Sequence, residues 1–216
     1  MPSTIILNME TPSVQYLCKK DKRLAKAISM VGPISYEQHD EDPYCFLVHE
    51  IIEQMLSVKV GEKIFQRLVE LCNNNLCPIT VANLTDEQIR SIGTSKSKVA
   101  YIRSITDAFL SGRLDYARLK NMPDAEVMKE LMSIRGIGAW TAKMYLIFVL
   151  DRQDILPLED VAFLQAYQWL YKTDNRNKSE VVKKCKKWSP YSSIAVRYLY
   201  RALDTVITKN EFHMYK

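Results

Sequence analysis

Residues 131–143 read Leu-Met-Ser-Ile-Arg-Gly-Ile-Gly-Ala-Trp-Thr-Ala-Lys, and this stretch decides the fold. It predicts the end of one helix, a tight turn at Gly136-Ile-Gly138 and a second helix from about Ala139, because glycine permits a sharp backbone turn. The backbone amides of Gly136, Gly138 and Ala139 would lie at the exposed start of the second helix, where phosphate oxygens bind. Taken alone, the stretch also fits a plain helix–turn–helix corner with glycine caps.

The rest of the chain has the apolar spacing of helices. Apolar residues recur three or four positions apart over 48–56, 60–71, 142–150 and 195–203, which places each set on one helix face. Strand-type alternation is limited to Thr4–Leu7. Only 6 glycines and 8 prolines occur in 216 residues, too few for the many tight turns of an all-β chain. We therefore expect an all-α, compact multi-helix bundle.

Composition excludes several classes of protein. No run approaches the roughly 18 apolar residues of a membrane span, and no basic flank precedes the short apolar run near the N-terminus, so we expect an intracellular chain with no secretory signal. The net charge of +5 weakly indicates an anionic partner. Basic residues cluster at 19–26 and 172–187, as they do on solvated helix faces.

The five cysteines are scattered, and no C-x-x-C pair occurs. The chain has only three histidines, and its cysteines and histidines do not occur at the spacings recognised for a zinc site or an iron–sulfur cluster. We expect free thiols in a reducing compartment.

The hairpin is followed by Leu156-Pro-Leu-Glu-Asp160, and the segments 46–68, 84–119 and 188–198 flank these motifs in a fixed order. This order resembles the helix–hairpin–helix (HhH-GPD) DNA glycosylase superfamily, and most of all its AlkA-like 3-methyladenine DNA glycosylase II branch. The resemblance covers residues from about 45 to 205. It implies a glycosylase domain over 41–216, with the hairpin at 131–143 and a catalytic loop and helix at 156–171. Residues 1–40 would form a helical segment that packs on this core, without the extra N-terminal β domain of larger members.

The resemblance implies that Asp160 is the catalytic carboxylate, at the opening of the helix after the hairpin. Hydrolysis of an N-glycosidic bond builds positive charge on the sugar, and a fixed carboxylate stabilises that charge and orients or activates water. The alternative for Asp160 is a helix N-cap, and one side chain can do both.

The same resemblance assigns the contacts with DNA. Met55, after Gln54, stands where the family inserts a side chain into the duplex, as apolar wedges do when a base is extruded. The spacing over 48–56 leaves open that Met55 is instead a core residue. Phosphate would be held by Gly136, Gly138, Ala139 and Thr141. Main-chain carbonyls of Met132, Ile134 and Gly136 match positions where the family holds a monovalent cation (Na⁺ or K⁺).

The resemblance also places residues around the extruded base: Trp140, Tyr200, Met144 and Val161. An alkylated purine is positively charged, and aromatic faces attract cations. Members that cleave the DNA backbone carry a lysine where this chain has Trp140, so we expect a monofunctional enzyme without lyase activity.

The sequence thus predicts an enzyme that excises alkylated purines from duplex DNA and initiates base-excision repair. We expect it to need no cofactor beyond the hairpin cation, to act as a monomer without a membrane partner, and to be cytoplasmic in a bacterium or nuclear in a eukaryote. Two alternatives remain: a non-catalytic helix–hairpin–helix DNA-binding module, and a helical interaction protein that binds no nucleic acid.

Overall fold

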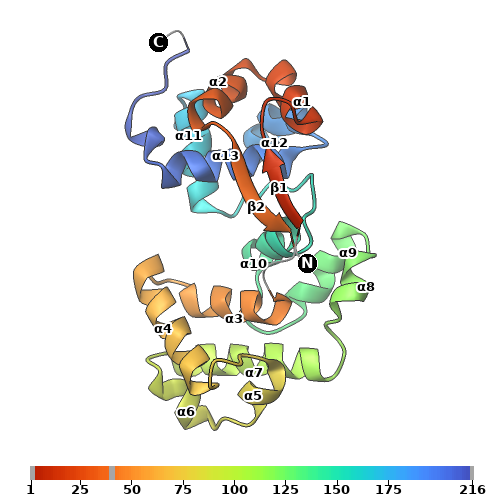
Figure 1. Ribbon diagram of the computed structural model, residues 1–216, viewed down its shortest axis with the longest axis vertical. Helices are drawn as coiled ribbons and strands as arrows, with labels where there is room; N and C mark the ends of the chain where they lie inside the picture. The colour runs from red at the N-terminus through yellow and green to blue at the C-terminus, as the bar shows by residue number, and fades with distance from the viewer. Residues whose placement is uncertain (1–2, 39–41, 215–216) are drawn as a thin grey trace. The chain divides into compact units, whose positions relative to one another are not determined.

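The computed structural model describes residues 3–38 and 42–214, which form two units (Figure 1). The central unit spans residues 41–150, and the terminal unit combines residues 1–40 with residues 151–216. The domain boundary expected between residues 40 and 41 lies outside the described residues.

The central unit is helical. Its core is built on α3, which packs against α4 and α7 and buries Val48, Ile51 and Ile52 completely. These residues recur at helical spacing, so one face of α3 is removed from water. The elements are α3 (Pro43–Glu53), α4 (Val58–Leu71), α5 (Pro78–Ala82), α6 (Asp86–Ser91), α7 (Lys96–Leu110), α8 (Tyr116–Lys120), α9 (Asp124–Met132), α10 (Ala139–Met144) and a π-helical turn at Tyr145–Val149.

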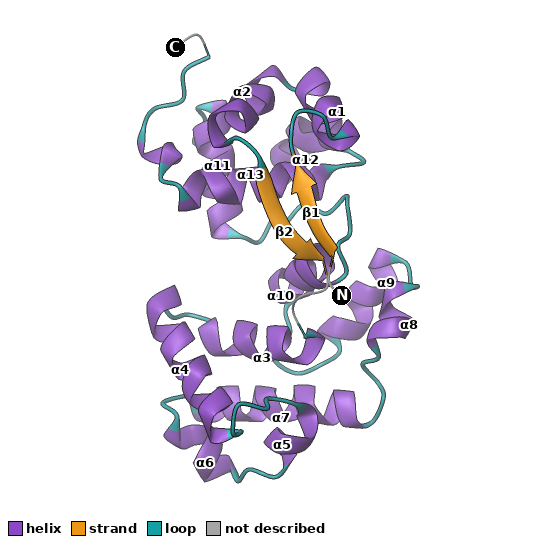
Figure 2. Cartoon of the chain, viewed as in Figure 1, coloured by secondary structure: helices purple, strands orange, loops and turns teal. Residues whose placement is uncertain are grey.

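The terminal unit joins both ends of the chain. Helix α13 packs against α11 and α2, and Figure 2 shows a small sheet beside these helices. In that sheet β1 and β2 pair antiparallel with Ile5 opposite Tyr36. The elements are β1 (Ser3–Leu7), α1 (Pro12–Lys20), α2 (Lys22–Val31), β2 (Ile34–Gln38), α11 (Val161–Tyr171), α12 (Lys178–Cys185), α13 (Ser192–Asp204) and 3-10 turns at Lys186–Trp188 and Ile207–Lys209.

A buried carboxylate ties the N-terminal segment to the C-terminal helices. Asp21 caps α2 and is only 2% exposed. It accepts hydrogen bonds from the Tyr171 hydroxyl and from Trp188 Nε1 at 3.0 Å, and Lys187 Nζ lies 3.0 Å away. Burial raises the pKa of Asp21, but these three donors outweigh it and leave the pKa below its usual value. The carboxylate therefore stays charged and fixes the packing of α2.

The all-α prediction is confirmed, with one addition. The first 40 residues were expected to be helical, yet their described part contains β1 and β2 as well as two helices. The run of β-branched residues at Thr4-Ile-Ile favours a strand, and it pairs with a partner about 30 positions later. Within the described residues, no helix is both long and apolar enough to cross a membrane.

Candidate functional site

The hairpin of the central unit has the geometry that the sequence predicts. Helix α9 ends at Met132, and α10 begins at Ala139 with Gly138 as its N-cap. Between them Ile137 is 5% exposed, and its amide donates to the Ile134 carbonyl at 3.1 Å. Ile137 therefore anchors the turn in the core, while exposed Gly138 stands at the start of α10.

The two hairpin glycines are there for different reasons. Gly136 has φ +100°, and a Cβ atom there would lie 2.5 Å from Cγ of Tyr101, so both backbone and packing require glycine. Gly138 has φ −96° and ψ 178°, which any residue adopts, and a Cβ there would meet nothing within 4 Å. Nothing in the chain itself demands glycine at 138, so its open surface is free for the close approach of a ligand.

Met55 projects fully into solvent from the turn between α3 and α4. The helix ends at Glu53, two residues earlier, and Met55 takes φ +61° and is 100% exposed. The alternative that Met55 belongs to the core stripe is therefore wrong. The left-handed conformation costs a non-glycine residue about 1–2 kcal/mol, and the full exposure leaves the Met55 side chain open to a partner.

Two long-range contacts hold this turn. Gln54 Nε2 donates to the Gly136 carbonyl at 3.2 Å and so joins the turn to the hairpin. Lys98 Nζ donates to the carbonyls of Ile52 at 2.8 Å and Gln54 at 2.6 Å. These bonds provide partners for carbonyls that have none within the helix at the end of α3. Burial lowers the pKa of Lys98. Gln54, expected to reach into DNA, is here a support for Met55.

Lys98 and Tyr101 are the site residues that the sequence did not reveal. Both lie on α7, and each acts on a backbone more than 30 positions away. Lys98 belongs to the Ser95-Lys-Ser-Lys98 segment, but nothing local distinguishes a lysine that caps a distant helix from a solvated one.

In the terminal unit, Asp160 is the N-cap of α11. Its Oδ1 accepts the Phe163 amide at 2.5 Å, and its own amide donates to the Pro157 carbonyl at 2.9 Å. Asp160 is only 9% exposed. Neighbouring Glu159 pairs with Lys178 at 2.9 Å. The two carboxylates thus differ: Glu159 is neutralised by a lysine, whereas Asp160 is held rigidly by backbone.

The other predicted residues vary in exposure. On α10, Trp140 is half-buried and Met144 is 4% exposed. Thr141 is 1% exposed, so little of its side chain is open to a phosphate, and its contact with phosphate stays a prediction. In the terminal unit, Tyr200 is half-buried on α13, and Val161 is 66% exposed at the start of α11.

Two of the three carbonyls expected to hold a cation already accept a hydrogen bond. Ile134 accepts the Ile137 amide and Gly136 accepts Gln54, while Met132 is 48% exposed. A carbonyl has two lone pairs, so these bonds leave capacity for an ion.

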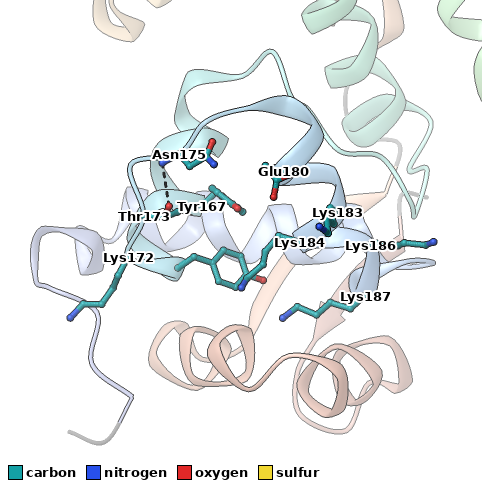
Figure 3. A pocket seen from close by; sticks show the side chains of 10 residues that line it. Tyr167, Lys172, Thr173, Asn175, Glu180, Lys183, Lys184, Lys186 and Lys187 are labelled. Carbon is teal, nitrogen blue, oxygen red and sulfur yellow. Dashed lines mark hydrogen bonds between the residues drawn. The ribbon is translucent and has the colours of Figure 1, made fainter.

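The basic cluster at 172–187 forms more than a solvated face. It lines a pocket of about 940 Å³ in the terminal unit, and Figure 3 shows the lysines of the cluster around this pocket. Lys184 Nζ lies 5.0 Å and Lys187 Nζ 5.3 Å from the Tyr171 ring centroid. The lining residues include none of those predicted to act on the base; they are Tyr167, Tyr171, Lys172, Thr173, Asn175, Glu180, Lys183, Lys184, Lys186 and Lys187.

Comparisons with known proteins agree with one another. The family described as "HhH-GPD superfamily base excision DNA repair protein" matches residues 48–190. The crystal structure of a DNA-3-methyladenine glycosidase from Bacillus halodurans superposes with a TM-score of 0.85 and 32% identity over 96% of each chain.

Two further similarities come from Schizosaccharomyces pombe. DNA-3-methyladenine glycosylase 1 is 29% identical over 184 residues, covering 83% of this chain and 80% of that protein. The structure of a 3-methyladenine DNA glycosylase in complex with abasic DNA superposes with a TM-score of 0.80 and 26% identity, over 90% of this chain and 97% of that one.

Proposed function

The chain belongs to the HhH-GPD superfamily of base excision DNA repair proteins, and from that premise we propose that it is a monofunctional DNA glycosylase that removes alkylated purines from duplex DNA. The observation that carries the proposal is the likeness along nearly the whole chain to a protein named a DNA-3-methyladenine glycosidase. The superfamily expected from the sequence is confirmed; the AlkA-like range of substrates, of the 3-methyladenine type, is part of the proposal.

Asp160 is the catalytic carboxylate in this proposal. Rupture of the N-glycosidic bond leaves an oxocarbenium-like sugar, and a carboxylate already held in place stabilises that cation without reorganising in the transition state. The Phe163 amide and the cap position provide this rigidity. The Asp160 carboxylate can also orient the water that attacks the sugar.

The hairpin holds a phosphate of the DNA. The backbone amides at the start of α10 carry partial positive charge, and open space over Gly138 lets a phosphate oxygen approach the backbone. Contact through neutral amides explains how a chain with a net charge of only +5 could bind a polyanion. A monovalent cation on the carbonyls of Met132, Ile134 and Gly136 stays a prediction.

Met55 is the wedge that replaces the extruded base. Extrusion leaves a gap in the stack, and a flexible thioether can fill an irregular gap. Its full exposure and the supports from Gln54 and Lys98 favour this role over a packing role.

Recognition of the damaged base is assigned to Trp140 and Met144 on α10, and to Val161 and Tyr200 on α11 and α13. The aromatic members would attract a cationic purine. Trp140 also carries the proposal that no lyase step occurs, because an indole cannot form the Schiff base that a lysine forms with the sugar.

The test is release of free base from duplex DNA carrying methylated, deaminated or etheno bases. We expect methylated purines to be released by the parent protein and retained by Asp160→Asn, and no covalent adduct to be trapped by borohydride. Salt-dependent DNA binding without release of any base would show a DNA-binding module instead, and absence of DNA binding would show an interaction protein.

A further inference from the structure

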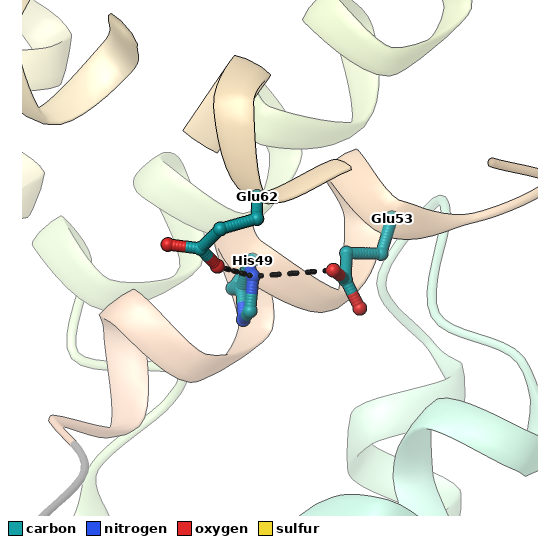
Figure 4. A group of neighbouring side chains, drawn as sticks. All are labelled: His49, Glu53 and Glu62. Atoms are coloured by element: carbon teal, nitrogen blue, oxygen red, sulfur yellow. Dashed lines mark ion pairs between the residues drawn. The ribbon is translucent and has the colours of Figure 1, made fainter. Parts of the chain in front are cut away.

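A histidine and two glutamates converge beside the Met55 turn, and none of the three is among the residues assigned above to the chemistry. Figure 4 shows His49 between Glu53 and Glu62. His49 and Glu53 are four residues apart on α3 and so share one face. Glu62 comes from the first turns of α4, on the other side of the turn.

Two of the separations are close to those of metal ligands. His49 Nε2 lies 3.2 Å from Glu62 Oε2 and 3.5 Å from Glu53 Oε1, and one donor atom from each residue lies within 4.8 Å of the others. Zinc binds nitrogen and oxygen at about 2.0–2.2 Å, which puts two tetrahedral ligands about 3.3–3.5 Å apart.

The same atoms are not occupied by hydrogen bonds. His49 Nε2 and Glu53 Oε1 are both inaccessible to solvent and have no hydrogen-bond partner. The three donor atoms face one another at ion-pair distances, and a cation placed between them would satisfy all three.

The neighbouring residues are shaped to hold the cluster. A Cβ atom on Gly61 would lie 2.7 Å from Glu53 Cγ, so glycine leaves the space in which the Glu53 side chain lies. The Phe65 ring lies 4.4 Å from the His49 ring, between centroids, and restricts its orientation. Glu53 is 22% and His49 30% exposed, while Glu62 is 58% exposed, which leaves a path for an ion and for water.

We propose that His49, Glu53 and Glu62 bind one divalent transition-metal ion of the zinc type, with water as the fourth ligand. An imidazole nitrogen with two carboxylates favours zinc or cobalt over magnesium and calcium, which prefer all-oxygen sites with more ligands. The bound ion joins the last residue of α3 to α4 and so stiffens the turn that presents Met55. The metal site does not depend on the proposed glycosylase activity.

The test uses the full chain and Co²⁺, followed by calorimetry and by visible absorption. We expect one equivalent to bind with the absorption of tetrahedral cobalt. His49→Ala and Glu53→Gln should each weaken binding at least about tenfold. Glu62→Gln changes a more exposed side chain, so it keeps the fold and should also weaken binding. His213→Ala is the matched control: His213 is exposed, faces Glu211 at 3.7 Å, and should not affect binding.

Two results would overturn the proposal. Equal binding by the parent and all three ligand variants, or a thiolate-to-cobalt charge-transfer band, would show that the ion prefers other groups such as the five free cysteines. No binding to the parent would show that the cluster is only a pair of ion pairs at the surface. For the stiffening, hydrogen exchange of amides 54–58 should slow with Co²⁺ in the parent and not in His49→Ala; unchanged exchange in the parent would refute that part.

Discussion

Replacing Gly136 with alanine should destabilise the central unit severely. The residue has φ +100°, and a conformation of this kind costs a non-glycine residue about 1–3 kcal/mol. The new Cβ atom would also lie 2.5 Å from Cγ and 2.6 Å from Cβ of Tyr101, and such overpacking costs about 1–3 kcal/mol. Together these costs reach about 2–6 kcal/mol, a large part of a typical free energy of unfolding.

Gly138→Ala is the matched control, since it makes the same substitution two residues later. The backbone there suits alanine and the space is open. Alanine restricts the conformations of the unfolded chain, which stabilises the folded protein by about 0.4–1 kcal/mol. This stabilisation offsets the loss of glycine as a good N-cap residue. Stability should therefore stay within about 1 kcal/mol of the parent. DNA binding should fall roughly 10–100-fold if the methyl group displaces a phosphate worth about 1.5–3 kcal/mol.

Thermal unfolding and DNA-binding titrations of both variants provide the assay. At roughly 2–4 °C per kcal/mol for a chain of this length, Gly136→Ala should lower Tm by roughly 5–20 °C. Tyr101→Ala should cost less in the Gly136→Ala background than in the parent, because loss of the ring relieves the overlap with Cγ, although the Cβ atom of residue 101 remains. A Gly136→Ala protein that melts with the parent, or a Gly138→Ala protein that binds DNA as the parent does, would refute the distinction between the two glycines.

Three other perturbations and a pH titration test single parts of the structure. Asp160→Asn should unfold in urea like the parent because asparagine also caps helices, whereas Asp160→Ala should lose about 1 kcal/mol; equal losses would contradict the capping role. Met55→Ala should leave Tm unchanged, since the side chain is fully exposed, but weaken binding to abasic DNA in anisotropy titrations; unchanged affinity would exclude the wedge. Lys98→Met should lower the free energy of unfolding by about 2 kcal/mol in urea, because it removes two charged hydrogen bonds. An unchanged urea midpoint would show that these two bonds to the end of α3 do not stabilise the protein. Burial raises the pKa of Tyr36 and of Tyr198 to about 12, from about 10 when unfolded. Their contribution to stability is therefore complete below pH 10 and is lost as pH rises to 12, so urea midpoints should fall over that range as tyrosinate absorbance appears; flat midpoints would contradict the burial.

The parts of the fold that sequence could predict are those with a local cause. Residues 131–143 contain their own turn, because the two glycines and Ile137 are consecutive and Ile137 bonds to Ile134 three positions earlier. The position of Asp160 as the N-cap of α11 follows in the same way from residues beside it.

Long-range contacts explain what the sequence did not predict. Apolar spacing continues from Val48 to Leu56, yet α3 ends at Glu53, because Lys98 satisfies its last carbonyls and Gln54 turns to the hairpin. Only that early ending puts Met55 into solvent. Apolar spacing over 142–150 likewise predicts a helix but not its change to π-helical geometry at Tyr145–Val149.

The cluster of His49, Glu53 and Glu62 was missed for a related reason. Sequence patterns for metal sites consist of several cysteines and histidines at fixed spacings, and a single histidine does not form one. The pair His49 and Glu53 at helical spacing is a local signal, but Glu62 joins it only through the packing of α4 on α3.

Single-turnover release of 3-methyladenine from methylated duplex DNA, by the parent and by Asp160→Asn, tests the central claim most directly. DNA affinity is measured for both proteins under the same conditions. The parent should release the base, and the variant should bind equally well but release it at least about 100-fold more slowly. Equal rates in the two proteins would remove Asp160 from the chemistry, and tight binding with no release by the parent would contradict the glycosylase itself.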